Sequence, residues 1–393
     1  MTGGTEAIRI LVAGAGLGGL TLVRALQGFD ASIDIVERSS TFAPMGVGIV
    51  LHPNGMAVLA HLGLSEMVRA KGNVIRRMEL IRENYRLDLL LSEVWSGASH
   101  STISILRPDL HEILAQASLS VRQNNVRLRM GCRVTAVNIS DGEPQAIFDD
   151  GTIERYDLIV AADGVHSAIR RSLLPGSDAV PTNLLYFRFP AYNTIGLPPD
   201  TWRTVERAGA SYGFIPLANN RVHCFVQLRT VENPDYRGVE EEFFEREFCP
   251  WDVVLQQALK ARCGPLHAGF AYMVSPFSWG TGACVLLGDA AHAISPTLSE
   301  GGSLAMEDAV VLSLALRRTN SIPEAIDTYR SVRQKRVMWS HRMALAQVNS
   351  MRRQRTQIQT DSAIATRHLQ QMYEPLRANP IPDFLLMPEC SSN

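Results

Sequence analysis

Cysteine is scarce in this sequence of 393 residues, and its placement excludes two kinds of site. There is no C-x-x-C pair, and no set of cysteines and histidines has zinc-ligand spacing, so neither a zinc site nor a disulfide framework is indicated. Free thiols are typical of a reducing compartment. The six cysteines are Cys132, Cys224, Cys249, Cys263, Cys284 and Cys390.

The chain also lacks an excess of positive charge, a long apolar run and any internal repeat. Lys and Arg number 38 and Asp and Glu 39, which gives a formal net charge of -1. Binding to nucleic acid or to an anionic membrane surface draws on net positive charge, so both are disfavoured. No apolar run reaches the length of a membrane span, and the N-terminal MTGGTEA lacks the layout of a signal peptide. We expect a cytoplasmic protein, monomeric or homodimeric, that acts on a small molecule.

A glycine-rich motif is the first chemical signal present. Residues 8–12 form an apolar, β-rich run, and GAGLGG follows at residues 14–19 before a helical pattern. In a dinucleotide-binding fold, Gly14 permits the tight turn, Gly16 lets the backbone approach a pyrophosphate, and Gly19 lets the helix pack close to the strand. The context of strand before and helix after is the one that this fingerprint requires.

An acidic residue stands at the expected distance from these glycines. A second strand pattern, residues 33–36, ends in Glu37, about 20 residues past the motif. A carboxylate at this place can accept hydrogen bonds from a ribose, and we count Glu37 and the adjacent Arg38 as candidate cofactor-binding residues. The alternative, a glycine turn of an unrelated α/β protein with an exposed glutamate, is disfavoured by the order of the two features.

Two further apolar runs each end in an aspartate beside a glycine. One closes on Asp163-Gly164, and the other closes on Gly288-Asp289 and leads through Pro296 to Gly301-Gly302, which opens a helical pattern. The free N–H groups and partial positive charge of a helix N-terminus suit an anion or an electron-rich heterocycle. Because ligands bind open α/β sheets at the carboxyl edge, the pattern predicts one ligand held from several strand ends.

Other segments supply candidate groups near that ligand. Arg107 stands at the edge of a helical pattern opened by Pro108, where its side chain can reach a phosphate or a ring. His52 lies in a loop just before a helix that starts at Pro53, and acid–base work there is weighed against a structural histidine. Residues 76–91 alternate as a hairpin that turns near Glu83-Asn84.

Residues 184–228 have the texture of a separate antiparallel sheet rich in aromatic side chains. One face of such a sheet can line a substrate pocket, although aromatic residues in strands are more often core. Tyr212 and His223 are candidate acid–base residues within it. Residues 238–261 are expected to be helical, and residues 126–137 a strand pair.

A long helix is expected over residues 322–351, and it carries many basic side chains. We interpret them as a solvated face rather than a nucleic-acid surface, because the chain has no net positive charge. The basic residues are Arg330, Arg333, Lys335, Arg336, Arg352, Arg353 and Arg355.

Together, GAGLGG, Glu37, AADGVHSAIR at 161–170 and LLGDAAHAISP at 286–296 resemble the single-component flavoprotein aromatic hydroxylases of the p-hydroxybenzoate hydroxylase type. The resemblance implies that Glu37 binds the adenosine ribose, that Arg107 lies on the flavin side, and that Asp163 with Gly164 serves FAD and the pyridine nucleotide. It also implies that Asp289 holds the ribityl chain. Pro296 would lie near the oxygen-reacting face, and amides around residues 298–302 would face the flavin.

By this resemblance the chain is an FAD-dependent monooxygenase that consumes NADPH or NADH. Reduced FAD would form a C4a-hydroperoxide with O2 and deliver one oxygen atom to an aromatic or other cyclic substrate. His52, Tyr212 or His223 would help to deprotonate a phenolic substrate. The alternatives are a Baeyer–Villiger oxygenase or a flavin reductase on the same scaffold and, more remotely, a non-catalytic nucleotide-binding escort protein.

The same comparison marks departures and predicts the domain layout. Ser299, Glu300 and Ser303 replace parts of a Gly-Gln-Gly-x-Asn type of segment, and Val47 stands where an arginine is sometimes found. The expected fold class is α/β, with a discontinuous Rossmann-like FAD-binding domain, an inserted mixed or antiparallel substrate sheet and a long C-terminal helix. The expected bounds are 1–75, 101–178 and 276–320 for the FAD-binding domain, 76–100 and 179–275 for the substrate domain, and 321–393 for the C-terminal segment.

Overall fold

The parallel sheet expected around the first glycine motif is present and has six strands. The computed structural model describes residues 7–42, 46–82, 85–119, 125–140, 143–207, 209–230, 236–275, 278–350 and 361–386. The strand order is β18-β19-β12-β1-β2-β8, and the neighbours from β19 to β8 run parallel. The strands are β1 (Ile8–Ala13), β2 (Ala31–Glu37), β8 (Asn125–Met130), β12 (Leu158–Ala161), β18 (Gly280–Thr281) and β19 (Cys284–Leu286).

The strands that precede the three motifs end side by side. Ala13 of β1 is level with Ala161 of β12, and Ala161 is level with Leu286 of β19. Apart from Ile8 and Arg9 at the start of β1, the three strands are apolar and buried, as strands of a parallel sheet covered on both faces should be. The glycine turn and both aspartate motifs therefore leave the sheet at one edge.

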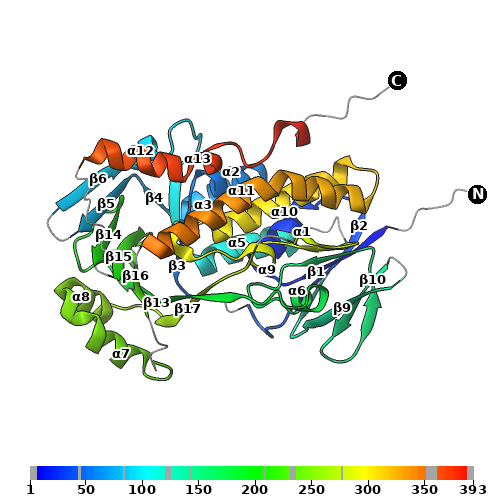
Figure 1. The fold of residues 1–393 in the computed structure, drawn as a ribbon, viewed down its shortest axis with the longest axis horizontal. Helices are drawn as coiled ribbons and strands as arrows, with labels where there is room; N and C mark the ends of the chain where they lie inside the picture. Colours follow the sequence, from blue (N-terminus) through cyan, green and yellow to red (C-terminus); the bar gives the residue numbers. More distant parts are fainter. Residues whose placement is uncertain are drawn as a thin grey trace, which may run out of the picture.

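Helices far apart in the sequence pack against this sheet and against one another (Figure 1). Helix α10 contacts α1, α2 and the long helix α11. The expectation of a long helix near residues 322–351 is thus confirmed. The helices concerned are α1 (Leu17–Ala25), α2 (Pro53–His61), α5 (Arg107–Leu119), α10 (Gly301–Arg318) and α11 (Ile322–Ser350).

A second, seven-stranded sheet lies at the other end of the molecule (Figure 1), with strand order β17-β13-β16-β15-β14-β5-β6. Its neighbours are antiparallel except β14 and β5, which run parallel, so the sheet is mixed as expected. The turn expected at Glu83-Asn84 lies outside the described residues. The strands are β5 (Arg77–Arg82), β6 (Tyr85–Leu90), β13 (Val180–Tyr192), β14 (Thr201–Arg207), β15 (Ala210–Leu217), β16 (Arg221–Arg229) and β17 (His267–Met273).

The two faces of this sheet meet different partners. The outer face carries an aromatic cluster covered by α7 (Glu240–Glu247) and α8 (Val253–Lys260). The inner face packs against Ile294, Leu298 and Leu304, which belong to the third motif and to α10. Alternating residues along each strand therefore point either to the two small helices or to the motif region.

Two expectations of secondary structure are wrong. Residues 126–137 do not form a strand pair, because β8 joins the parallel sheet whereas β9 (Val134–Ser140) pairs with β10 (Glu143–Phe148). Residues 238–261 are two helices rather than one, and Pro250 lies in the short 3-10 turn η1 (Cys249–Trp251) between them. Proline lacks the N–H that a continuous helix needs.

The remaining elements are short. β9 and β10 form a sheet with β11, β7 forms another with β3 and β4, and α12 packs on β6. Along the described parts of the chain, no helix is long and apolar enough to cross a membrane. These elements are β3 (Gly48–Leu51), β4 (Asn73–Ile75), β7 (Thr102–Leu106), β11 (Ile153–Arg155), α3 (Ser65–Lys71), α4 (Leu91–Val94), α6 (Ala168–Leu173), α9 (Asp289–His292), η2 (Pro296–Leu298), α12 (Ser362–Met372), α13 (Glu374–Arg377) and η3 (Asp383–Leu385).

Candidate functional site

The glycine turn after β1 packs directly on the end of β12. Gly14 has a φ of 111°, and a Cβ built on it would lie 2.3 Å from the Ala162 carbonyl oxygen. A Cβ on Gly19 would lie 2.0 Å from the Gly14 carbonyl oxygen. Gly16 differs, since its φ is −78° and a Cβ there would meet nothing within 4 Å. Protein packing explains Gly14 and Gly19, whereas the close approach of a ligand would explain Gly16.

Glu37 holds this turn from the end of β2. Its carboxylate accepts hydrogen bonds from the backbone N–H of Ala15 at 3.2 Å and of Ser39 at 3.0 Å. Glu37 is half-buried and the adjacent Arg38 is exposed. A carboxylate has about four acceptor positions, so Glu37 keeps capacity for a further donor.

The second motif ends β12 with a carboxylate that is only half satisfied. Asp163 Oδ2 accepts hydrogen bonds from the N–H groups of Ala168 and Ile169 at the start of α6. Its Oδ1 is buried with no partner among the described residues. Burial raises the pKa of Asp163, and the hydrogen bonds from Ser167, Ile169 and Ala168 oppose that shift. An orphaned oxygen of this kind fits a ligand hydroxyl or amide.

Arg170 connects the second motif to the third, and sequence reasoning missed it. Its side chain is 1% exposed and donates to the carbonyl oxygens of Val165 at 2.7 Å and of Ala290 at 2.9 Å. The signal was the first of two adjacent arginines in the AIRR segment of α6, and the pattern alone cannot distinguish it from the exposed Arg171 beside it.

The third motif brings Asp289 to the N-terminus of α10. A Cβ on Gly301 would lie 3.7 Å from Asp289 Oδ1, and a Cβ on Gly302 would lie 2.9 Å from Ile49 Cδ1. Asp289 is exposed, yet the crowding of protein around it raises the pKa of its carboxyl by desolvation. Electrostatic interactions with His292 and Arg107 act in the opposite direction. Arg107, half-buried at the start of α5, is therefore within electrostatic reach of this motif.

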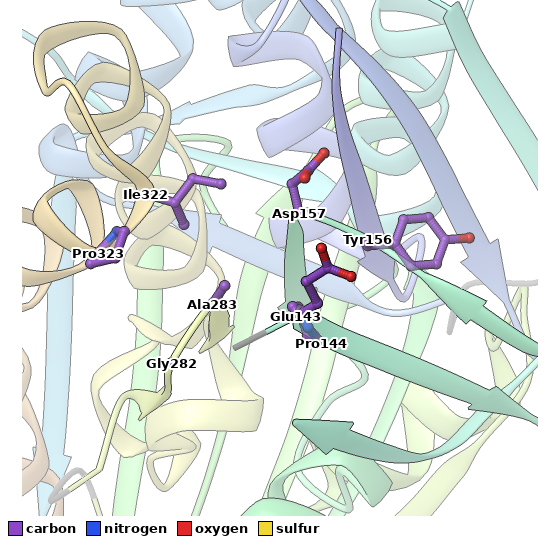
Figure 2. Close-up of a pocket in the computed structure, with 8 residues that line it drawn as sticks. All are labelled: Glu143, Pro144, Tyr156, Asp157, Gly282, Ala283, Ile322 and Pro323. Carbon is purple, nitrogen blue, oxygen red and sulfur yellow. The ribbon is translucent and has the colours of Figure 1, made fainter. Parts of the chain in front are cut away.

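A surface cavity lies at the other end of this sheet, away from these groups. A cavity of about 350 Å³ is lined by Glu143, Asp157 and Ile322 among others, and Figure 2 shows them. Asp157 precedes β12 and Asp163 follows it. The cavity thus lies at the amino ends of the strands, away from the three motifs.

A buried charge cluster lies beneath the third motif, and it corrects the interpretation of the basic helix. Arg333 is fully buried and Arg336 is 8% exposed, so neither belongs to a solvated face. Arg333 Nε lies 2.6 Å from Asp308 Oδ1, and Arg336 Nε lies 2.8 Å from Glu307 Oε2. Arg330 is exposed as expected, and Arg352, Arg353 and Arg355 lie outside the described residues.

Asp308 ties this cluster to the motif itself. Its Oδ2 accepts a hydrogen bond from the Gly288 N–H at 3.0 Å and lies 2.6 Å from His292 Nε2. Burial alone would raise the pKa of Asp308, but interactions with His292 and Arg333 outweigh burial and lower the pKa to about 2. The adjacent acids Glu307 and Asp308 in an otherwise apolar helix were the signal that could have predicted the cluster.

Two of the candidate acid–base residues lie on the inner face of the second sheet or beside it. His52 caps the start of α2, is 1% exposed and stacks on Trp95 with ring centroids 5.0 Å apart. His223 Nδ1 accepts from the Gly48 N–H at 3.3 Å. Burial lowers the pKa of each to about 3, so both imidazoles are neutral; Arg188 adds to the shift of His223, and the Leu298 backbone opposes that of His52.

Tyr212 is not brought to the same place. It belongs to the outer aromatic cluster, and its hydroxyl donates to Asp252 Oδ2 at 2.7 Å on the side covered by α8. Because side chains alternate along β15, Tyr212 and the inner-face Ile215 point to opposite faces. Tyr212 therefore lies on the face of the sheet that points away from the third motif, where an acid–base group would not reach a ligand held by the three motifs.

Known proteins with similar sequences and structures identify the family of this chain. The sequence fits the FAD binding domain family over residues 7–343. The aurachin C monooxygenase/isomerase of Stigmatella aurantiaca is 30% identical, over 84% of this chain and 86% of that protein. The FAD-dependent urate hydroxylase of Klebsiella pneumoniae is 29% identical, over 84% and 87%. A variant of Klebsiella pneumoniae HpxO complexed with FAD superposes with a TM-score of 0.80 at 25% identity, over 94% of this chain and 96% of that one.

Proposed function

Because the chain belongs to the family of FAD-dependent aromatic hydroxylases and monooxygenases, we propose that it uses NADH or NADPH and O2 to insert one oxygen atom into an aromatic or other cyclic substrate. The convergence of the three motifs at one edge of the parallel sheet carries this proposal. When bound, FAD would accept a hydride from the nicotinamide and activate O2 at its C4a atom, with the second oxygen atom leaving as water.

The residues present fit this cofactor. Gly16 leaves open space for a pyrophosphate, and Glu37 keeps acceptor capacity for the adenosine ribose, with Arg38 beside it. Asp163 offers its unpartnered Oδ1, and Asp289 would hold the ribityl chain. Backbone groups would make many of the contacts to FAD. Ser299 and Ser303, which differ from the usual family residues, would therefore not remove those contacts.

Around the flavin ring, the chain would stabilise negative charge on the ring and surround it with apolar side chains that exclude water. The N-terminus of α10, thinned by Gly301 and Gly302, would stabilise negative charge on the ring, with Arg107 on the same side. Pro296 would lie near the oxygen-reacting face. Apolar side chains of the inner face and of the segments packed against it would exclude water from the site; they include Trp202 and Phe225 of the sheet, and Trp95, Ile294 and Leu298.

His52 and His223 would act as neutral hydrogen-bonding groups. A base for a phenolic proton works best with a pKa near the working pH, and both histidines hold values near 3. Their proposed task is therefore to orient the substrate rather than to remove a proton.

The arrangement of the two large sheets supports a proposal for which parts of the chain bind FAD and which bind the substrate. We assign 1–75, 101–178 and 276–320 to FAD binding, 76–100 and 179–275 to the substrate, and 321–393 to a covering helix and tail. The crossing of β5 and β6 into the seven-stranded sheet supports the assignment of residues 76–100 to the substrate side.

Asp289→Ala tests the cofactor site. The variant should purify without the visible absorbance of bound flavin, because the carboxylate that holds the ribityl chain is gone. Asp252→Ala, which removes a carboxylate from the outer face of the second sheet, is the matched control and should keep its FAD. An Asp289→Ala protein with full FAD and activity would sink the assignment.

A substrate screen separates the reaction classes. NADH and NADPH oxidation is followed with candidate aromatic and cyclic compounds, and each product is weighed by mass spectrometry. A new hydroxyl carrying one atom of labelled O2 supports the proposal, whereas a ring-inserted oxygen indicates Baeyer–Villiger chemistry. Reduction without oxygen uptake indicates a flavin reductase. A purified protein that binds no added FAD would indicate an escort protein.

A further inference from the structure

Arg188 of β13 is a cation with no anion beside it. Its Nε atom is buried without a hydrogen-bond partner, and within the described ranges its guanidinium makes no hydrogen bond or ion pair. The guanidinium carbon lies 5.1 Å from the centroid of the Tyr186 ring, two residues earlier on the same face of the strand. The Tyr186 hydroxyl lies 3.4 Å from Ser295 Oγ, which places this face beside the segment that leads into Pro296.

The positive charge of Arg188 is not balanced by any carboxylate among the described groups that shift its pKa. Burial lowers its pKa, Tyr186 opposes that shift, and the charge of Arg107 adds to it. A buried charge without a counter-charge is unfavourable, because it has lost its hydration and gained no attraction in return. An anion that binds here would remove this cost.

Two neutral imidazoles stand next to the guanidinium. His267 of β17 is level with Arg188 across the sheet, and its Nε2 is buried with no partner among the described residues. His223 of β16 accepts the Gly48 N–H on Nδ1, so its proton is on Nε2, which is free to donate. The positive charge of Arg188 lowers the pKa of both histidines. Among the described residues, this region therefore offers the Arg188 cation and polar hydrogen-bonding groups, and no carboxylate shifts the pKa of Arg188.

We propose that Arg188 anchors an anionic oxygen group of the substrate, either a carboxylate or an ionised ring hydroxyl. This inference rests on the proposed function and deepens it by naming a substrate class. The planar guanidinium would hold the anion through N–H···O hydrogen bonds, and the His223 Nε2–H would add another. The contact between Tyr186 and Ser295 would fix the distance from this anchor to the flavin side of the pocket.

The test compares anionic probes with neutral ones of the same shape. Benzoate and benzamide, and 4-nitrophenolate and 4-nitroanisole, are titrated into FAD-loaded protein while the flavin absorbance is followed. In the wild type at least one anion should bind about tenfold or more tightly than its neutral counterpart. In Arg188→Gln that preference should vanish while the neutral probe binds as before. Arg188→Lys should keep part of the preference, because it keeps the charge and loses the planar fork.

A matched control comes from the outer face of the same sheet. Arg207 of β14 also lies near an aromatic ring, with its guanidinium carbon 6.0 Å from the centroid of the Tyr212 ring. Arg207→Gln should leave the anion preference unchanged. Which anion carries the preference distinguishes a carboxylate anchor from a hydroxyl anchor.

Three results would overturn the proposal. They are no anion preference in the wild type, a preference that survives in Arg188→Gln, and loss of FAD from Arg188→Gln with the preference intact, which would place the arginine on the cofactor. A wild-type protein that binds no FAD contradicts the proposed function instead. The probes are then titrated against the fluorescence of the inner-face tryptophans, so the anchor is still tested.

Discussion

Glu300 is a buried carboxyl at the start of α10, and half of it lacks a partner. Its Oε2 accepts a hydrogen bond from the Asn54 amide at 2.8 Å, whereas its Oε1 is buried without a partner among the residues that the structure describes. Burial raises the pKa of Glu300 to about 8, against the hydrogen bond from Asn54. A glutamic acid that stays protonated at neutral pH is close in shape to the glutamine of the family segment, so this departure is conservative.

Glu300→Gln should stabilise the protein at pH 7 and not at pH 4. The folded pKa lies above the ordinary value of 4.5, so the unfolded chain ionises first and stability is lost as pH rises from about 4.5 to 8. Integrated to pH 7, this loss is about 3 kcal/mol, and glutamine avoids it. Urea unfolding at both pH values measures the difference, with the exposed Glu242→Gln as control. An equal difference at pH 4 and pH 7 would contradict the assignment.

At the scale of the elements, the turn between β1 and α1 contains a glycine required by protein packing, Gly19, and one that a bound ligand would require, Gly16. Gly19→Ala drives a methyl group into the Gly14 carbonyl oxygen, whereas Gly16→Ala meets no protein atom within 4 Å. We expect Gly19→Ala to destabilise the FAD-free protein by about 2 kcal/mol or more, and Gly16→Ala by less than about 1 kcal/mol. Gly16→Ala should instead weaken FAD binding at least tenfold. Chemical unfolding without FAD and titration with FAD distinguish the two, and normal FAD affinity in Gly16→Ala would remove the ligand argument.

The pairing of α10 with α11 rests on buried charge. Arg333→Met leaves Glu307 and Asp308 short of a counter-charge, which should lower the free energy of unfolding by about 3–5 kcal/mol. Arg330→Gln, one turn earlier on the same helix, breaks only the exposed pair with Asp327 and should cost less than about 0.5 kcal/mol. Both are measured at saturating FAD, since ligand binding adds to stability. A small effect of Arg333→Met would mean that the cluster is not structural.

The sequence predicted those parts of the fold and of the site whose pattern lies within a few consecutive residues. The glycine turn, Glu37 and the two aspartate motifs each follow a strand within a few residues, and the carboxyl-edge rule then brings them together. The orientation of Arg333 could not be predicted from its own helix, because it depends on two acids in α10. Likewise, β8 and β9 are adjacent in sequence but belong to different sheets, because β8 pairs with β2 and β9 pairs with β10. The β8–β2 pairing joins residues far apart in the sequence, so the local pattern could not predict it. The contrast between Tyr212 and His223 required the register of β15 against β16.

At the scale of the whole molecule, His52 and His223 both lie where the seven-stranded sheet meets other elements, since His52 stacks on Trp202 of β14 and His223 accepts a hydrogen bond from Gly48 of β3. Both folded pKa values are depressed from 6.5 to about 3, so the unfolded chain binds protons first and stability falls as pH drops below about 6.5. At pH 5 each histidine should cost about 2 kcal/mol.

His223→Gln isolates one of these contributions. Between pH 7.5 and pH 5 the variant should lose about 2 kcal/mol less unfolding free energy than the wild type. His166→Gln, at an exposed position, should track the wild type. Denaturant unfolding across this range provides the measurement, and parallel curves for His223→Gln and the wild type would show that His223 is not held neutral.

The order of strands in the parallel sheet also has a consequence for biosynthesis. β1 begins at residue 8, but β19 and the N-terminus of α10, which complete the cofactor site, arrive only near residues 284–302. During translation the glycine turn therefore emerges long before Asp289 can stand beside it. We therefore expect FAD to bind only after α10 has left the ribosome, and until β19 is added, β12 is an unpaired edge strand of the nascent sheet.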